Sequence, residues 1–256
     1  MNGIEHSGVS QAAPGARSPD EKYPFWDVKD ALVFLTSGLP ALIAGGFAAR
    51  TIFSFPVLSR AFGQAPELLT AQFLGYLVWF AFLWIILRTR YRRPFWKSLA
   101  WKLRWKDFPL HALSGVVLAV GVAAGGVLLQ VPDIDMPIKR LLSSRSSMLL
   151  IGLAATTAGP LCEELAFRGF FLPLLIRGLG PAFGILATAL PFALLHGPQY
   201  AWSWRHLLFI TIAGAAFGLK RYRSGSTAAA AIMHAAYNVT FFTAYVVCGK
   251  DLPAKW

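Results

Sequence analysis

Two adjacent glutamates, Glu163 and Glu164, lie in a stretch of sequence that otherwise has the composition of a membrane span. An ionised side chain in hydrocarbon costs at least about 2.5–3.5 kcal/mol on insertion scales, so such a pair needs a polar cavity, a partner or a chemical task. Two other apolar segments carry one histidine each, His196 and His234. Carboxylates and imidazoles together are suited to activating water or relaying protons.

The spacing around the glutamates gives them different tasks. On a helix, Glu164 and Arg168 are i,i+4 neighbours with the acid first, which is the favourable order for an ion pair. Arg168 can therefore hold Glu164 ionised and fixed, while Glu163 points about 100° away and is free to act as a general base. A purely structural Glu–Arg pair would explain Glu164 and Arg168 but not Glu163. Gly159-Pro160, just before the pair, interrupts the backbone hydrogen bonds and could open room for water.

Each histidine shares a helix face with a second side chain one turn away. Phe192 precedes His196 by four residues, and His234 precedes Asn238 by four. Taken alone, His196 is typical of an interfacial residue near the end of a span, and His234–Asn238 is typical of hydrogen-bond contacts between membrane helices. One shared polar site accounts for all three segments together.

The composition indicates that a membrane surrounds these segments. The 256 residues are 56% hydrophobic and only 14% charged, and the mean hydropathy is +0.53, whereas soluble domains are about a quarter charged. We expect an all-α, polytopic transmembrane helical bundle with about seven spans, eight being the alternative. The net charge of +12 fits cytoplasmic loops rich in Lys and Arg, and we expect no nucleic-acid partner. Two cysteines provide no disulfide framework.

The expected spans lie at about 31–53, 68–87, 109–131, a fourth that starts near residue 148 and holds the glutamates, then 181–196, 206–219 and 226–248. Between the second and third, residues 88–108 are basic and rich in Trp. This segment is either an interfacial helix that binds anionic lipid or a simple loop, and both interpretations place it in the cytoplasm. Because successive spans alternate in direction, the basic turn at Lys220–Arg223 is then also expected on the cytoplasmic side. This topology places the N-terminus inside the cell and the C-terminus outside.

Three parts follow from these boundaries. Residues 1–28 are expected to be a disordered tail, 29–146 three N-terminal transmembrane helices with the basic loop, and 147–250 a catalytic helical core. We expect an integral, multi-pass protein of a bacterial cell (inner) membrane, and the sequence gives no indication of its oligomeric state. Counting along the helices puts Glu163 and His196 at different depths, so they meet only if helices tilt or if Pro160 and Pro191 shift the register.

Three motifs resemble one known family. Glu163-Glu164-x-x-x-Arg168, Phe192-x-x-x-His196 and His234-x-x-x-Asn238 are similar in order and spacing to those of the CAAX-protease and bacteriocin-processing intramembrane proteases, also called Abi-domain proteins. The resemblance covers about residues 147–248. It implies an intramembrane endopeptidase that hydrolyses membrane-associated peptides or proteins. Glu163 and His196 would activate water, and His234 and Asn238 would stabilise the oxyanion; Glu164, Arg168 and Phe192 would support the site.

Metal dependence and two other functions stay open at this point. Glu163, His196 and His234 could hold zinc, but the His-Glu-x-x-His signature is missing, and asparagine is a better oxyanion donor than zinc ligand. We favour metal-independent hydrolysis by a glutamate-activated water. Cys162, in apolar company, is expected to be inert. The alternatives are a non-catalytic peptide-binding or immunity protein that uses the same pocket, and a proton-coupled transporter, which the lack of an inverted repeat disfavours.

Overall fold

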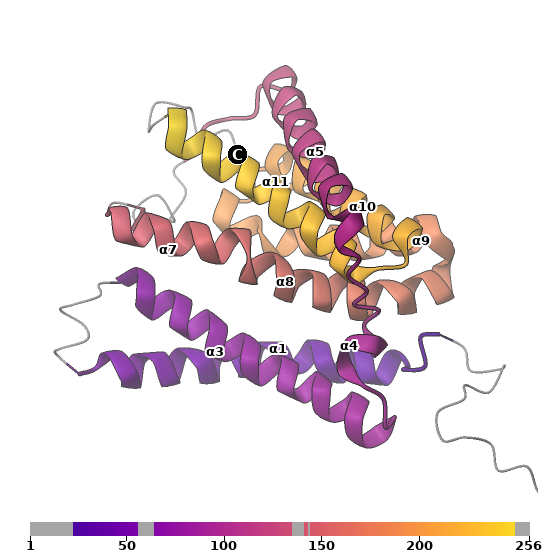
Figure 1. Ribbon diagram of the computed structural model, residues 1–256. Helices are drawn as coiled ribbons and strands as arrows, with labels where there is room; N and C mark the ends of the chain where they lie inside the picture. The colour runs from indigo at the N-terminus through magenta and orange to yellow at the C-terminus, as the bar shows by residue number, and fades with distance from the viewer. Residues whose placement is uncertain (1–22, 56–63, 135–140, 143, 249–256) are drawn as a thin grey trace, which may run out of the picture.

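The computed structural model describes residues 23–55, 64–134, 141–142 and 144–248, and within them every regular element is a helix (Figure 1). The predicted all-α class is therefore confirmed. The elements are α1 (Val28–Phe53), α3 (Gln64–Ile85), π-helical η1 (Ile86–Arg90), α4 (Phe95–Ser98), 3₁₀-helical η2 (Trp105–Asp107), α5 (Phe108–Leu128), α7 (Arg145–Thr156), α8 (Ala158–Glu164), π-helical η3 (Leu165–Phe171), α9 (Leu172–Leu195), 3₁₀-helical η4 (Gly197–Tyr200), α10 (Trp204–Ser224) and α11 (Thr227–Cys248).

Five helical stretches of the described chain are long and apolar enough to cross a membrane: Val28–Phe53, Gln64–Arg90, Trp105–Leu128, Arg145–Leu195 and Thr227–Cys248. The fourth has 51 residues and contains both the fourth and the fifth expected spans. α10 coincides with the expected sixth span but is not among the five, because charged residues at both ends shorten its apolar stretch. The protein is thus an integral, multi-pass membrane protein.

Backbone irregularities shape the stretch that carries the glutamates. Thr157, with φ −128° and ψ −79°, separates α7 from α8, and seven π-helical residues follow Glu164. At Gly180 the backbone takes φ 77°, which favours glycine, and the chain turns back on itself. Behind this turn, a Cβ on Gly184 would come within 2.7 Å of the backbone nitrogen of Ile176. The second half of α9 therefore returns closely along the first and carries Phe192 back towards the glutamates.

The front helices form a separate layer. Figure 1 shows α1 and α3 side by side below α7 and α8, with α5 and α11 above. α1 and α3 approach closely because both carry glycine where they cross: a Cβ on Gly45 would lie 2.3 Å from the backbone nitrogen of Gly75. Phe34 of α1 stacks on Trp79 of α3 with ring centroids 4.5 Å apart.

The chain is packed from Tyr23 onward, so the expected tail of residues 1–28 extends too far; residues 1–22 lie outside the described part. Trp26 is fully buried, stacks on Phe170 of η3 at 5.0 Å and donates its indole N–H to the Phe170 carbonyl at 3.2 Å. An aromatic side chain with a satisfied donor is a strong anchor. This short N-terminal strap, residues 23–27, therefore supports the π-helix that follows the glutamates.

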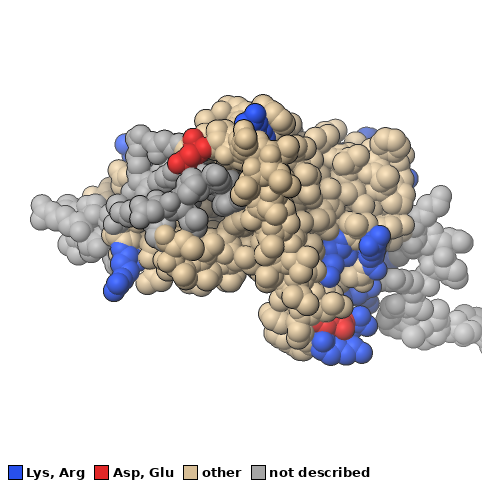
Figure 2. Space-filling view, turned by 90° about the horizontal axis from the view of Figure 1, so that it is seen from above, with Lys and Arg blue, Asp and Glu red and all other residues tan. Residues whose placement is uncertain are grey.

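The basic segment 88–108 is packed against the bundle, and its binding of anionic lipid stays a prediction. Leu99 is fully buried, and its carbonyl accepts a hydrogen bond from the Thr227 hydroxyl at 2.6 Å. The Thr227 backbone N–H donates to the Ala100 carbonyl at 3.0 Å. These contacts place the segment against the turn between α10 and α11. The two basic clusters are thus neighbours in the fold. Figure 2 shows several Lys and Arg side chains gathered towards one end of the molecule and others scattered at the opposite end and the top.

Candidate active site

A buried ion pair forms the centre of the site. Arg168, on η3, donates from Nη1 to Glu164 Oε1 at 2.8 Å and from Nη2 to the Gly214 carbonyl of α10 at 2.7 Å. The side chains of Glu164 and Arg168 are both fully buried. Burying two charges costs several kcal/mol per ion unless good geometry and further hydrogen bonds compensate for the loss of water. The predicted i,i+4 pairing is thus present, and its two charges are held rigidly.

His234 of α11 joins the two glutamates. Its Nδ1 lies 2.9 Å from Glu164 Oε1, and its Nε2 lies 3.8 Å from Glu163 Oε2. With a proton on Nδ1, the ring donates to Glu164 and turns Nε2 towards Glu163. Glu164 therefore orients the imidazole much as the buried carboxylate of a catalytic triad does.

Aromatic rings enclose the charged groups. The Arg168 guanidinium carbon lies 4.6 Å from the ring centroid of Phe192 and 5.5 Å from that of Phe217. Phe217 also stacks on the His234 imidazole, with centroids 4.4 Å apart and planes at 19°. These rings exclude water and strengthen the electrostatic interactions inside. Glu164 Oε2 and Arg168 Nε are buried without a hydrogen-bond partner among the described residues, a cost that native structures seldom carry without a function.

Glu163 differs from its neighbour in accessibility. Its side chain is 24% exposed, whereas that of Glu164 is fully buried. Among the described residues, no Lys or Arg forms an ion pair with Glu163. This accessible carboxylate with an imidazole beside it is the group best placed to act on a water molecule.

His196 and Asn238 lie at the edges of this cluster. His196 ends α9, packs against the Phe192 ring at 4.8 Å and contacts the Phe192 carbonyl through Nδ1 at 2.8 Å. Phe192 in turn contacts the His234 ring at 5.9 Å. Asn238 donates from Nδ2 to the Ala155 carbonyl of α7 at 2.7 Å. Of the two histidines, His234 is the one within 4 Å of a glutamate, although the motifs imply that His196 is the partner of Glu163.

Tyr76, in the front layer, is a site residue that the sequence analysis missed. It lies on α3 within electrostatic range of Glu163, and its hydroxyl accepts a hydrogen bond from the Gln72 amide at 3.0 Å. Two polar side chains one helical turn apart inside an apolar span were the available signal. The front layer therefore contributes to the surroundings of Glu163.

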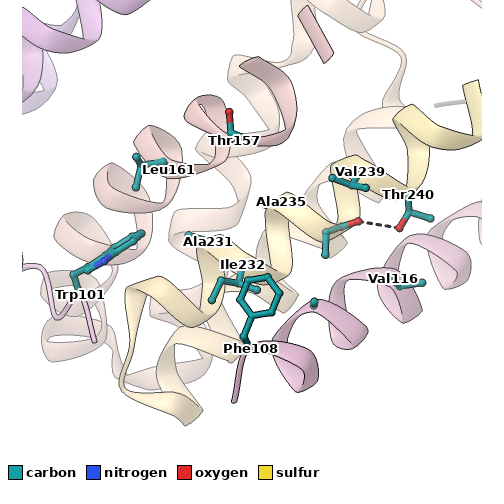
Figure 3. A pocket seen from close by; sticks show the side chains of 12 residues that line it. Trp101, Phe108, Val116, Thr157, Leu161, Ala231, Ile232, Ala235, Val239 and Thr240 are labelled. Atoms are coloured by element: carbon teal, nitrogen blue, oxygen red, sulfur yellow. Dashed lines mark hydrogen bonds between the residues drawn. The ribbon is translucent and has the colours of Figure 1, made fainter. Parts of the chain in front are cut away.

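An apolar cavity of about 490 Å³ lies against the helices that carry the glutamates and His234 (Figure 3). Leu161 of α8 and Ala235 and Val239 of α11 form part of its lining, and Phe108 and Trp101 close another part. On α11, Ala235 directly follows His234. The charged residues do not line this cavity, so it offers an apolar binding surface next to the polar cluster.

The donor set does not fit a metal in this arrangement. Within the described residues, no three His, Cys, Asp or Glu side chains are grouped closely enough to hold a metal ion. Glu164, the carboxylate nearest His234, is already held by Arg168. Glu163, His196 and His234 therefore do not form a ready three-ligand set, and no reaction step is assigned to zinc.

Fold and site together define a multi-pass helical membrane protein with a buried carboxylate–imidazole–guanidinium centre. Residues 145–240 match a family model described as Rce1-like, type II CAAX prenyl endopeptidase. The match spans all three motifs and confirms the resemblance noted from them. It supports an intramembrane endopeptidase of the CAAX-processing kind in general terms. No curated protein and no solved structure matches the chain.

Proposed function

We propose that this protein hydrolyses a peptide bond inside or at the edge of the membrane and that Glu163 activates the water. The observation that carries the proposal is the division of labour between the two adjacent glutamates. Glu164 is held by Arg168 and His234 and is not available as a base. Glu163 is accessible and faces the Nε2 atom of His234.

The proton balance is simple. A water molecule gives a proton to Glu163 as its oxygen attacks the carbonyl carbon of the substrate. The resulting oxyanion needs a hydrogen-bond donor, and loss of one such donor costs roughly 2.7–4 kcal/mol in comparable sites. The proton on Glu163 then passes to the amide nitrogen as the carbon–nitrogen bond breaks.

Two imidazoles and one amide surround this step. His234, oriented by Glu164, can donate to the oxyanion when its ring carries a proton on Nε2. His196 keeps Nε2 available, because its Nδ1 contacts the Phe192 carbonyl, and we propose that this nitrogen helps to position the water. Asn238 supplies a second donor to the oxyanion.

The substrate class follows from the cavity and the matched family. We propose that an apolar group of the substrate lies in the 490 Å³ cavity while the scissile bond reaches Glu163. The family description names a CAAX prenyl endopeptidase. A farnesylated peptide with a CAAX terminus is therefore the first substrate to test, and the same peptide without the lipid is its control.

The experiment compares wild type, Glu163→Gln, Glu164→Gln and Glu67→Gln in detergent, with mass-spectrometric detection of product. Glu67 lies in the first turn of α3, more than two helical turns before Tyr76, and provides the same chemical change as a control. We expect Glu163→Gln to lower the rate by about 10²–10⁴-fold, the usual contribution of a general base, with unchanged thermal stability. Glu164→Gln should lower both rate and stability, and Glu67→Gln neither.

Each alternative result has a meaning. Cleavage by Glu163→Gln at the wild-type rate would show that another group activates the water. Tight binding of the peptide by wild type without any product would instead favour the non-catalytic peptide-binding function.

A further inference from the structure

A second cavity, of about 250 Å³, lies at the basic end of the molecule and has no part in the proposed hydrolysis. It is bounded by the N-terminal strap, the start of α9 and the end of α10. Its lining combines two arginines and two tyrosines with an apolar patch: Tyr23, Leu172, Pro173, Ile176, Arg177, Arg221 and Tyr222.

Arg221 is an unusual member of this lining because it is only 7% exposed. Its Nε donates to the Thr227 hydroxyl at 3.0 Å and its Nη2 to the Tyr23 hydroxyl at 3.1 Å, so both partners are neutral. Arg177 donates to two backbone carbonyls of the strap, those of Pro24 and Trp26. Within the described residues, no carboxylate pairs with Arg177 or Arg221.

The contrast with Arg168 shows what is missing. Arg168 is also buried, but Glu164 neutralises it at 2.8 Å. A buried cation without a counter-charge is costly, and proteins normally avoid one unless it is paired. Arg221 is the buried cation of this cavity, and the exposed Arg177 beside it adds a second positive charge, so the two together indicate that a bound anion supplies the counter-charge.

We propose that this cavity binds a phosphate group through Arg177 and Arg221. Guanidinium groups match phosphate oxygens in pairs, and both arginines line this cavity. Leu172 and Ile176 give the same cavity an apolar wall that suits the glycerol and upper acyl region of a lipid. The phosphate can belong to an anionic lipid headgroup or be free in solution.

The position of the cavity agrees with a lipid source. Two of its lining residues contact the basic clusters: Tyr23 donates to the Ser98 carbonyl of segment 88–108 at 3.2 Å, and Arg221 donates to Thr227 at the start of α11. Both basic clusters are expected to face the cytoplasm. Anionic lipids are concentrated in the cytoplasmic leaflet, and basic pockets between membrane helices on that side bind their headgroups. The proposal does not depend on the hydrolysis proposed above.

The test uses the full chain in a neutral detergent. Thermal unfolding is followed with inorganic phosphate against chloride at equal ionic strength, and native mass spectrometry counts retained lipid after addition of phosphatidylglycerol or phosphatidylcholine. The variants are Arg177→Gln, Arg177→Lys and Arg223→Gln. Arg223 is an exposed residue two positions after Arg221 that does not line the cavity, so it is a matched loss of charge at the same helix end. Arg177 is chosen because it is exposed, and the unfolding temperature of each variant without ligand shows whether the loss of its hydrogen bonds to the strap alters folding.

We expect phosphate to raise the unfolding temperature of wild type and phosphatidylglycerol to be retained at one copy per chain. Arg177→Gln should weaken the binding of phosphate and of phosphatidylglycerol by at least about tenfold, a typical loss for one charge-assisted contact. Arg177→Lys should weaken their binding by less, and Arg223→Gln should hardly change it. Stabilisation by phosphate without retained lipid supports the site with free phosphate as its source. The proposal would be overturned if phosphate did not change the unfolding temperature and no phosphatidylglycerol were retained. Equal losses of binding affinity in Arg177→Gln and Arg223→Gln would overturn it as well.

Discussion

The front layer and the back half of the molecule both bury acidic groups, but they do so differently. In the front, Asp30 of α1 is 3% exposed and accepts from Arg90 at 2.6 Å and from the Tyr91 hydroxyl at 2.5 Å. Arg90 itself is 52% exposed and lies at the end of η1. In the back, Glu164 and Arg168 are both fully enclosed by helices and aromatic rings.

The two clusters differ because Asp30 lies at the end of a helix, whereas Glu164 lies in the middle of the bundle. Asp30 lies in the first turn of α1, where Asp27 and Asp30 form a capping box, and acids are favourable at a helix N-terminus. Water and the helix end therefore offset the cost of the front cluster. Glu164 receives no such help, and its two partners come from η3 and α11. A charge that expensive in mid-bundle indicates a site, whereas the front cluster holds two helix ends together.

The two ion pairs should differ most in how much stability the protein loses when the arginine of each pair is replaced. Arg168→Met should destabilise the protein by about 3–5 kcal/mol, because it leaves Glu164 buried without its counter-ion. Arg90→Met should cost clearly less, because Arg90 is itself half-exposed and the buried Asp30 keeps the Tyr91 hydroxyl and the Asp27 backbone N–H as hydrogen-bond donors. Chemical unfolding in detergent measures both. Equal losses of unfolding free energy in the two variants would contradict the claim that the back ion pair is the more costly one to break.

A smaller effect is expected from coupling within the back cluster. His234 and Arg168 share one oxygen of Glu164, so removing either changes what the other contributes. The free-energy changes of Glu164→Gln and His234→Gln should be non-additive by about 0.5–3 kcal/mol in a double-mutant cycle. The cycle of Glu164→Gln with Asp30→Asn is the control and should be additive, because these residues belong to different layers.

The sequence predicted those features of the fold and site that depend on composition and local spacing. Hydropathy located the helices, and i,i+4 spacing predicted the Glu164–Arg168 pair that the structure contains. The motif order pointed to one family, and the match over residues 145–240 agrees.

What could not be predicted depends on contacts between residues distant in sequence. Trp26 contacts Phe170 across 144 residues, and no local pattern around Trp26 distinguishes a buried anchor from a polar tail. Likewise, a glycine such as Gly180 is compatible with a helix in a sequence pattern, and its φ of 77° becomes visible only in the fold. The contact of His234 with Glu163 likewise joins residues far apart in the sequence. The roles of the four motif residues remain predictions.

The smallest predicted effect concerns pH and the front cluster. Burial, together with the hydrogen bond to Asp30, raises the pKa of Tyr91 to about 12 from an ordinary value of 10. The native state therefore holds the phenolic proton more tightly than the unfolded chain, so this contribution is complete below pH 10 and disappears as the pH rises through 12. The stability difference between wild type and Tyr91→Phe should accordingly be constant at lower pH and shrink over that interval. A difference that stays constant would mean that the Tyr91 proton is not what joins η1 to α1, and the front cluster would then depend on Arg90 alone.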